Sequence, residues 1–217
     1  MPENRKVLVF SSGTPDGGAT GFDYLAFRVH VNTARIKIAA AVSQHAEGGT
    51  RRIAENYRIP FIHFPGPWND DRYRAVAEMA RAEWFALYGW TKLVRGLDPR
   101  RTFNTYPAPL PRFGGRGMYG LEVHRVVLEA YRAGQIAKSE VCMHFVTPEY
   151  DAGPVFFRKS VEIRADDTPE TLAARVKETE RAWYCSVVER ILDGDVHWDG
   201  VHAESLVTPP NFLEPPP

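Results

Sequence analysis

The first apolar segment and the loop that follows it constrain the fold more than any other feature of the sequence. Residues 7–10 form a continuous apolar run, Val-Leu-Val-Phe, and a glycine-rich stretch over residues 11–21 follows directly. A strand that is apolar on both faces is typical of a sheet covered by helices on both sides. The start of the chain therefore predicts an α/β fold that opens with a buried strand.

Further along the chain, strand-like apolar runs alternate with segments of helical spacing. The predicted strands cover residues 36–42, 60–64, 141–146 and 155–163. A further buried run covers residues 84–87. The predicted helices cover residues 22–31, 49–57, 70–81, 121–132 and 169–192, and Asn69 and Thr168 are their clearest N-caps. This alternation implies a mostly parallel sheet. Residues 98–120, rich in proline and glycine, are predicted to be a long irregular loop with a functional role.

Length and charge limit what the chain can be. Its 217 residues suit one domain, predicted over residues 1–200, followed by a proline-rich, loosely held tail over 201–217. The 27 basic and 27 acidic residues balance, which gives no overall reason to bind nucleic acid or an anionic membrane. The chain has no apolar run of about 18 residues and no signal-peptide core. Two distant cysteines, Cys142 and Cys185, favour a reducing compartment, and we expect a cytoplasmic protein.

Three polar motifs lie at a predicted strand end or in a loop, and ligands of open α/β sheets bind at the carboxyl ends of strands. The glycine-rich loop could offer backbone N–H groups to a phosphate or be a flexible turn, because its spacing matches neither nucleotide-binding fingerprint. The second motif is Asn104-Thr105-Tyr106-Pro107, and the third runs from His144 to Asp151-Ala152-Gly153-Pro154. Composition alone favours plain turn roles for Asn104 and Asp151.

The order of these motifs resembles that of the formyltetrahydrofolate-dependent formyltransferases, and among them the branch that formylates glycinamide ribonucleotide in purine synthesis. The resemblance extends over residues 7–192. Residues 104–107 are similar to the Asn-x-His-Pro signature of that family, and residues 144–154 to its second signature. Residues 87–94 look like its folate-lining segment, and residues 174–180 like the late helix that helps hold the ribonucleotide.

The resemblance implies an α/β, Rossmann-like, open and mostly parallel twisted sheet flanked by helices. It implies 10-formyltetrahydrofolate as co-substrate, with no metal. The implied catalytic residues are Asn104, Tyr106 and Asp151. The implied acceptor-binding residues are Ser12, Gly13, Lys177 and Glu180, and the implied folate-binding residues are Thr91, Lys92, Leu93, Val94 and His144.

Tyr106 departs from the family pattern, which has histidine at this position. In the family mechanism Asn104 would donate its amide to the developing oxyanion, and Asp151 would sit near the transferring proton. A tyrosine hydroxyl, with an ordinary pKa of about 10, is a neutral donor and supplies no imidazolium charge. We therefore expect reduced or altered activity. His144 aligns with a histidine that the family already has, and His124, on a predicted helix, is more typical of a surface or packing residue.

Two other functions stay open. One is transfer of a formyl group to a nucleotide-linked amino sugar, and the other is a non-catalytic protein that binds folate or a nucleotide. Lys177 and Glu180 could also form only a solvated ion pair on one helical face. The expected partners are small molecules, with no nucleic acid and no membrane, and a homodimer is an open alternative.

Overall fold

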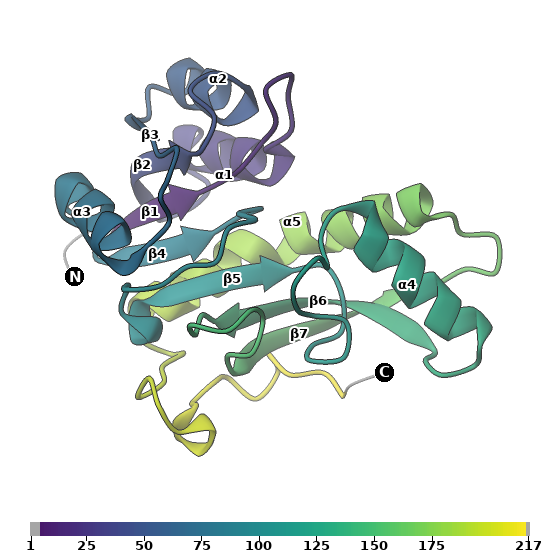
Figure 1. Ribbon diagram of the computed structural model, residues 1–217. Coiled ribbons are helices and arrows are strands. Elements are labelled where there is room, and N and C mark those ends of the chain that lie inside the picture. Colours follow the sequence, from purple (N-terminus) through teal and green to yellow (C-terminus); the bar gives the residue numbers. More distant parts are fainter. Residues whose placement is uncertain (1–4, 216–217) are drawn as a thin grey trace.

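A seven-stranded sheet forms the centre of the protein in a computed structural model that describes residues 5–215 (Figure 1). The strand order is β3-β2-β1-β4-β5-β6-β7. The bounds of the strands are β1 (Lys6–Phe10), β2 (Lys37–Ser43), β3 (Phe61–His63), β4 (Trp84–Leu87), β5 (Thr102–Tyr106), β6 (Lys138–Phe145) and β7 (Val155–Glu162). Neighbours from β3 to β5 pair in parallel, whereas β6 is antiparallel to β5 and to β7. The predicted fold class is confirmed.

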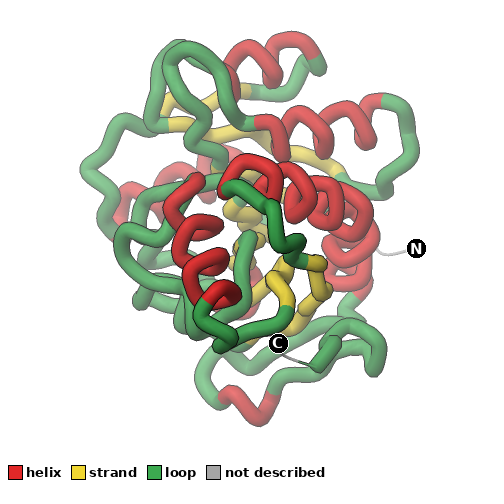
Figure 2. Tube along the Cα trace, turned by 90° about the vertical axis from the view of Figure 1, so that its right-hand side faces the viewer, coloured by secondary structure: helices red, strands yellow, loops and turns green. Residues whose placement is uncertain are grey.

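Residues 5–215 contain five α-helices, which lie around this sheet in the side view of Figure 2. Their bounds are α1 (Thr20–His30), α2 (Gly49–Asn56), α3 (Asp70–Ala80), α4 (Leu121–Arg132) and α5 (Pro169–Asp193). Both predicted caps are present, since Asn69 accepts a hydrogen bond from the Arg72 amide and Thr168 forms a capping box with Thr171. Among the helices of residues 5–215, none combines the length and apolarity needed to cross a bilayer.

The alternation of side chains along β1 divides the core between the two faces of the sheet. Val7 and Val9 pack in one cluster with residues of α1 and α5, whereas Leu8 and Phe10 pack in another with residues of α3. All four side chains are at most 1% exposed. A third cluster joins α4 to the far end of β6 and to the start of α5. The doubly covered β1 explains why residues 7–10 are apolar without a break.

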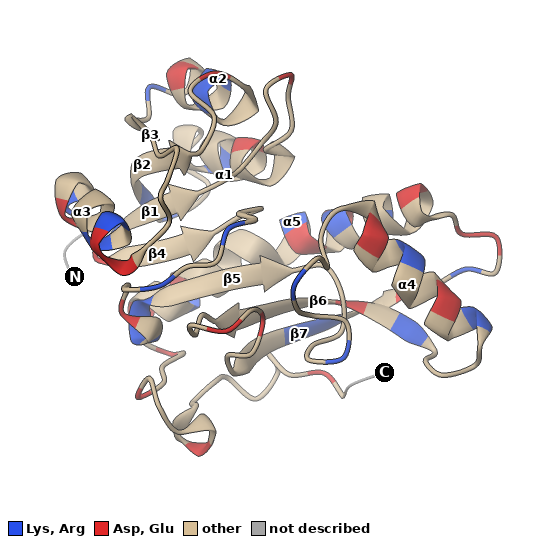
Figure 3. Cartoon of the chain, viewed as in Figure 1, with Lys and Arg blue, Asp and Glu red and all other residues tan. Residues whose placement is uncertain are grey.

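The outer surface carries both signs of charge. Acidic and basic residues alternate along α4, where Arg125 pairs with Glu122 and Glu129 (Figure 3). Such exposed pairs contribute little to stability but keep like charges apart. On this helix, as in the whole chain, the acidic and basic residues balance.

The region 98–120 differs from its prediction as a wholly irregular loop. It contains a short 3₁₀ turn, Pro99–Arg101, and then strand β5, Thr102–Tyr106, in the middle of the sheet. The residues of β5 are Thr-Phe-Asn-Thr-Tyr, mostly β-branched or aromatic types that favour strands. Because prolines and glycines surround this short segment, the sequence pattern did not indicate a strand, although β5 pairs with β4 and β6.

The tail also differs from its prediction, because the structure holds it against β7. The Arg158 amide donates to the Phe212 carbonyl at 2.7 Å, and the Phe212 side chain is buried. The carboxylate of Glu214 pairs with Lys159 and accepts from the Ser160 amide at 2.8 Å. The part of the tail up to residue 215 is therefore fixed, and residues 216–217 lie outside the described residues.

Candidate active site

Two cavities adjoin at the carboxyl ends of β1, β4 and β5. The first has a volume of about 590 Å³ and the second of about 570 Å³. Both are lined by Gly89, Thr105, Pro107 and Gly120, so the residues around the end of β5 separate them. Strand order reverses between β1 and β4, because β2 lies on one side of β1 and β4 on the other. This crevice is where open α/β sheets bind ligands.

The second cavity contains the residues predicted from the two signatures and from the folate-lining segment. Asn104, Tyr106 and Asp151 line it, as do His144 and the four consecutive residues 91–94. Its apolar wall is formed by Leu87, Trp90, Leu93, Val94 and Val146. Segments that are far apart in the sequence, from Leu87 to Asp151, thus meet around one space.

Asn104 and His144 are cross-strand partners in the β5–β6 pairing. The Nδ1 atom of His144 lies 2.8 Å from the Phe145 carbonyl oxygen, which can only accept, so Nδ1 carries the proton. The Nε2 atom then accepts from Asn104 Nδ2 at 3.1 Å. Burial lowers the pKa of His144, with Asp151 acting in the opposite direction. With Nδ1 as the donor, the Nε2 lone pair of His144 is directed to the Asn104 amide within the site.

Asp151 reaches this pair from the turn between β6 and β7. Its backbone has a φ of 53°, a left-handed conformation that aspartate tolerates better than most residues. One carboxylate oxygen, Oδ2, accepts from the Gly115 amide at 2.9 Å. The other, Oδ1, lies 3.7 Å from His144 Nε2. A carboxamide, an imidazole and a carboxylate therefore form one cluster, here called the Asn104–His144–Asp151 cluster.

Tyr106 also lines the second cavity, but its hydroxyl is hydrogen-bonded to the loop after β5 and not to the Asn104–His144–Asp151 cluster. The hydroxyl donates to the Phe113 carbonyl at 2.6 Å and lies 3.0 Å from the Met118 carbonyl. Its side chain is 5% exposed, and burial raises the pKa of Tyr106 above its ordinary value. The oxyanion-donor role implied by the resemblance needs a free hydroxyl proton, and here that proton is already engaged by the loop.

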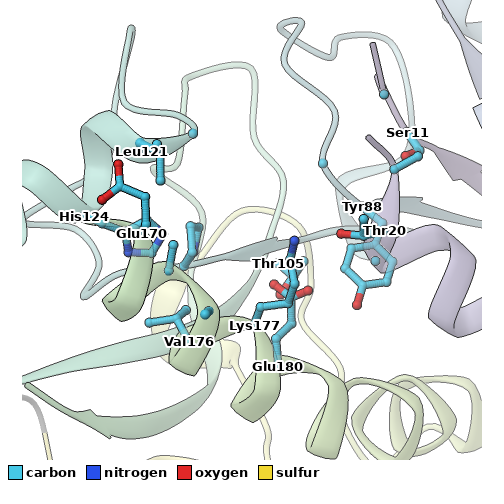
Figure 4. A pocket seen from close by; sticks show the side chains of 18 residues that line it. Ser11, Thr20, Tyr88, Thr105, Leu121, His124, Glu170, Val176, Lys177 and Glu180 are labelled. Carbon is cyan, nitrogen blue, oxygen red and sulfur yellow. The ribbon is translucent and has the colours of Figure 1, made fainter. Parts of the chain in front are cut away.

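The first cavity holds three of the four predicted acceptor-binding residues, Gly13, Lys177 and Glu180. Figure 4 shows Lys177 and Glu180 projecting from α5 toward Thr105. Ser12 does not line it. The Ser12 hydroxyl instead accepts from the Thr91 amide at 3.1 Å and lies 3.2 Å from the Thr91 hydroxyl, so it joins the loops after β1 and β4.

Ser11, Thr20 and Gly21 also line the first cavity. They lie in the glycine-rich stretch over residues 11–21 but were not among the residues named for acceptor binding. The Ser11 hydroxyl is buried and has no hydrogen-bond partner among residues 5–215. Thr20 and Gly21 form the first turn of α1, whose N-cap residue, Ala19, provides no side-chain cap. A polar Thr-Gly pair at the boundary between a glycine-rich loop and an apolar helix is a helix-start signal, and it could have identified them.

Of the two alternatives expected for His124, a surface or a packing residue, the structure shows a packed one that also lines the first cavity. It is 5% exposed and lines the far end of the first cavity, beyond Lys177 (Figure 4). Burial, with a smaller effect of Lys177, lowers the pKa of His124 to about 4. The helical spacing placed it on the inner face of α4, a distinction that composition alone does not make.

Burial raises the pKa of Glu180 to about 7, although Tyr88, Lys177 and Arg181 partly oppose this effect. The ionised form is thus disfavoured in the folded state, so its cost is absent below the ordinary pKa of 4.5 and grows as the pH rises to about 7. We expect Glu180→Gln to match the parent in stability near pH 4 and to exceed it by about 1–3 kcal/mol at pH 8. Urea unfolding at both pH values measures this, and an equal difference at both would contradict it.

Within the described part of the chain, no group of three or more His, Cys, Asp or Glu side chains is arranged to hold a metal ion.

Comparison with known proteins identifies the class to which this fold and site belong. The family described as formyl transferase matches residues 5–188, which is most of the chain. The chain therefore belongs to the formyl transferase family. Members of this family use formyl-tetrahydrofolate.

Several individual relatives are phosphoribosylglycinamide formyltransferases. The chain is 31% identical over 213 residues to the chloroplastic phosphoribosylglycinamide formyltransferase of Arabidopsis thaliana, covering 92% of this chain and 70% of the relative. It is 26% identical to the phosphoribosylglycinamide formyltransferase of Bacillus subtilis, covering 87% and 95%. The crystal structure of glycinamide ribonucleotide transformylase 1 from Symbiobacterium toebii has the same fold, with a TM-score of 0.77, 22% identity and coverage of 92% and 93%.

Proposed function

We propose that this protein transfers a formyl group from 10-formyltetrahydrofolate to the amine of glycinamide ribonucleotide. The observation that carries the proposal is the Asn104–His144–Asp151 cluster, which lies in the second of two adjoining cavities. Group transfer needs two substrates to meet at one point, and two cavities with a common boundary provide that arrangement. The relatives named above, at up to 31% identity, support the choice of acceptor.

The second cavity suits the folate donor. Its volume of about 570 Å³ is within the usual range for small-molecule sites, about 300–1,000 Å³. Apolar side chains, among them Trp90, Leu93 and Val94, provide a surface for a flat heterocycle, and Thr91 and Lys92 line the same space. His144 stands at the side of this space next to Asn104, which is where the formyl group would lie.

The first cavity suits a phosphorylated acceptor. The first turn of α1 opens into it at Thr20 and Gly21, and free N–H groups at a helix N-terminus attract phosphate. The unpartnered Ser11 hydroxyl lies at the same end. Glu180, further along, can accept hydrogen bonds from ribose hydroxyls, and Lys177 adds a positive charge near the middle of the cavity.

The cluster can perform the transfer with groups already in place. The acceptor amine attacks the formyl carbon, and the electron pair of the carbonyl moves to its oxygen, where the second N–H of Asn104 Nδ2 can stabilise the charge. The amine then loses a proton to Asp151, whose Oδ1 atom lies beside the basic Nε2 atom of His144. The bond from carbon to the folate nitrogen breaks, and that nitrogen takes the proton as the carbonyl re-forms.

A nucleotide-linked amino sugar is the second candidate acceptor, because the first cavity extends beyond Lys177. Leu121, His124 and Glu170 line this extension, on the side of Lys177 opposite to Thr20 (Figure 4). An acceptor larger than a ribose phosphate would use this space. If neither acceptor reacts, we expect a non-catalytic binding protein, because position 106 holds tyrosine where the family pattern has histidine.

One assay separates these functions. The purified protein is given a folate formyl donor, and the absorbance of the deformylated folate is followed with glycinamide ribonucleotide or with nucleotide-linked amino sugars. We expect turnover with glycinamide ribonucleotide and loss of that turnover in Asn104→Ala. Turnover only with an amino sugar would show that glycinamide ribonucleotide is not the acceptor. Calorimetric binding of folate without any turnover would favour a non-catalytic binding protein.

Gly21 tests the assignment of the first cavity to the acceptor. A Cβ atom at this position would lie 2.5 Å from the Tyr88 ring, which is stacked on Tyr184 at a centroid distance of 4.0 Å and has little room to retreat. We expect Gly21→Ala to raise the acceptor KM about tenfold and to leave the donor KM unchanged. Gly17→Ala is the matched control, because nothing lies within 4 Å of its Cβ position. Equal effects on both KM values would contradict the assignment.

A further inference from the structure

The Tyr106 hydroxyl joins the two ends of a short loop. One hydroxyl proton is shared between the Phe113 carbonyl, at 2.6 Å, and the Met118 carbonyl, at 3.0 Å. The ring is buried against the third core cluster, which includes Val123 and Val127 of α4. Residues 113–118 form the loop thus held, here called the clamped loop, and four of them from Gly115 to Met118 line the second cavity.

The clamped loop in turn contacts Asp151. The Gly115 amide donates to Asp151 Oδ2 at 2.9 Å, and a Cβ atom at Gly114 would lie 2.9 Å from the Cβ atom of Asp151. The loop backbone therefore packs directly on the aspartate and fixes one carboxylate oxygen. The other oxygen is left to face His144 Nε2 at 3.7 Å. A movement of the loop would change the direction of both oxygens.

We propose that Tyr106 is a positioning residue: by clamping residues 113–118 it makes the Gly115 amide orient Asp151, and His144 serves as the imidazole of the reacting cluster. This inference rests on the proposed formyl transfer. The residue at position 106 then acts through the loop and the aspartate, without touching the formyl group. A tyrosine suits this role because its hydroxyl extends to carbonyls that a shorter imidazole at the same place would not reach in the same way.

The geometry of His144 supports the second half of the proposal. Its Nδ1–H is held by a backbone carbonyl, so its ring orientation and tautomer are fixed. Its Nε2 atom is near both Asn104, at 3.1 Å, and Asp151, at 3.7 Å. Once Asn104 Nδ2 releases the Nε2 lone pair, the imidazole can share a proton that arrives on Asp151, which is the role that a histidine at position 106 would otherwise have.

Tyr106→Phe removes only the hydroxyl and is the test of the clamp. Hydrogen–deuterium exchange in peptides covering residues 113–119 is expected to become about 3- to 10-fold faster, because hydrogen bonds that restrain the loop are lost. Tyr131→Phe is the matched control, since this tyrosine of α4 packs on the same cluster and lies outside the clamped loop. Unchanged exchange in Tyr106→Phe would overturn the clamp, whether or not the protein transfers formyl groups.

Kinetics test whether the clamp acts through Asp151. Tyr106→Phe is expected to lower kcat about tenfold and to change the acceptor KM less than twofold. In an Asp151→Asn background the same substitution is expected to change kcat less than twofold, because the charge that the loop orients is already absent. A full tenfold loss in that background would overturn the link to Asp151. If Tyr106→Phe fails to fold, Asp151→Ala removes the acceptor of the Gly115 amide, and unchanged exchange of that amide would overturn the contact by which the clamped loop orients Asp151.

Absence of formyl transfer by the parent protein would count against the proposed function alone. The exchange experiment would still decide the clamp, because it requires no substrate. Faster exchange in Tyr106→Phe together with no turnover would separate a correct structural role from a wrong function.

Discussion

Replacing Asn104 by alanine is expected to lower kcat for formyl transfer about 100- to 1,000-fold, the usual cost of losing one oxyanion donor. Asn104 lies in β5 and its amide is held by His144 Nε2 at 3.1 Å, so one N–H is fixed and the other can face the formyl oxygen. The substrate-binding residues of both cavities are unaltered, so both KM values should change little. Steady-state kinetics with each substrate varied in turn measures the effect.

The control for this prediction is Asn56→Ala at the exposed C-terminal end of α2. It removes the same group from a place outside both cavities, and its kcat should equal that of the parent. A loss in Asn104→Ala of less than about threefold, or a loss seen only in KM, would show that Asn104 does not stabilise the transition state.

Asp151→Asn is expected to lower kcat about 100-fold or more, within the range of about 100- to 10,000-fold for general acid–base groups. The substitution keeps an oxygen that can accept from the Gly115 amide, so the loop contact at 2.9 Å survives while the charge is lost. Loss of this charge also removes the influence that raises the pKa of His144 against the effect of burial. The neutral form of the His144 imidazole is then favoured further, and no carboxylate is left to accept the proton of the acceptor amine.

The matched control is Asp71→Asn on the first turn of α3, where the side chain is 89% exposed. Exposed ion pairs such as the one between Asp71 and Arg74 contribute little to stability, so this variant should behave like the parent. Normal turnover in Asp151→Asn, measured with saturating substrates, would remove Asp151 from the proton transfer and with it the mechanism proposed here.

The sequence predicted most helices and strands because their signals are local. Helix α4 has the bounds predicted for it, and the Thr168 cap appears as expected. Strand β5 was missed because it lies among prolines and glycines and because its pairing with β4 and β6 is non-local. The same reason explains the tail, whose fixation depends on Arg158 and Lys159 of a distant strand.

What the amino-acid sequence determined by itself is the type of fold and the identity of the polar groups around the second cavity, because apolar periodicity and ordered motifs are written along the chain. Only the tertiary structure decided what those groups do to one another. It engaged the Tyr106 hydroxyl with the clamped loop, turned Ser12 toward Thr91, and brought His124 into the first cavity. The physical reason is that a hydrogen bond between distant segments depends on the direction of each side chain after packing, and direction is absent from a linear sequence.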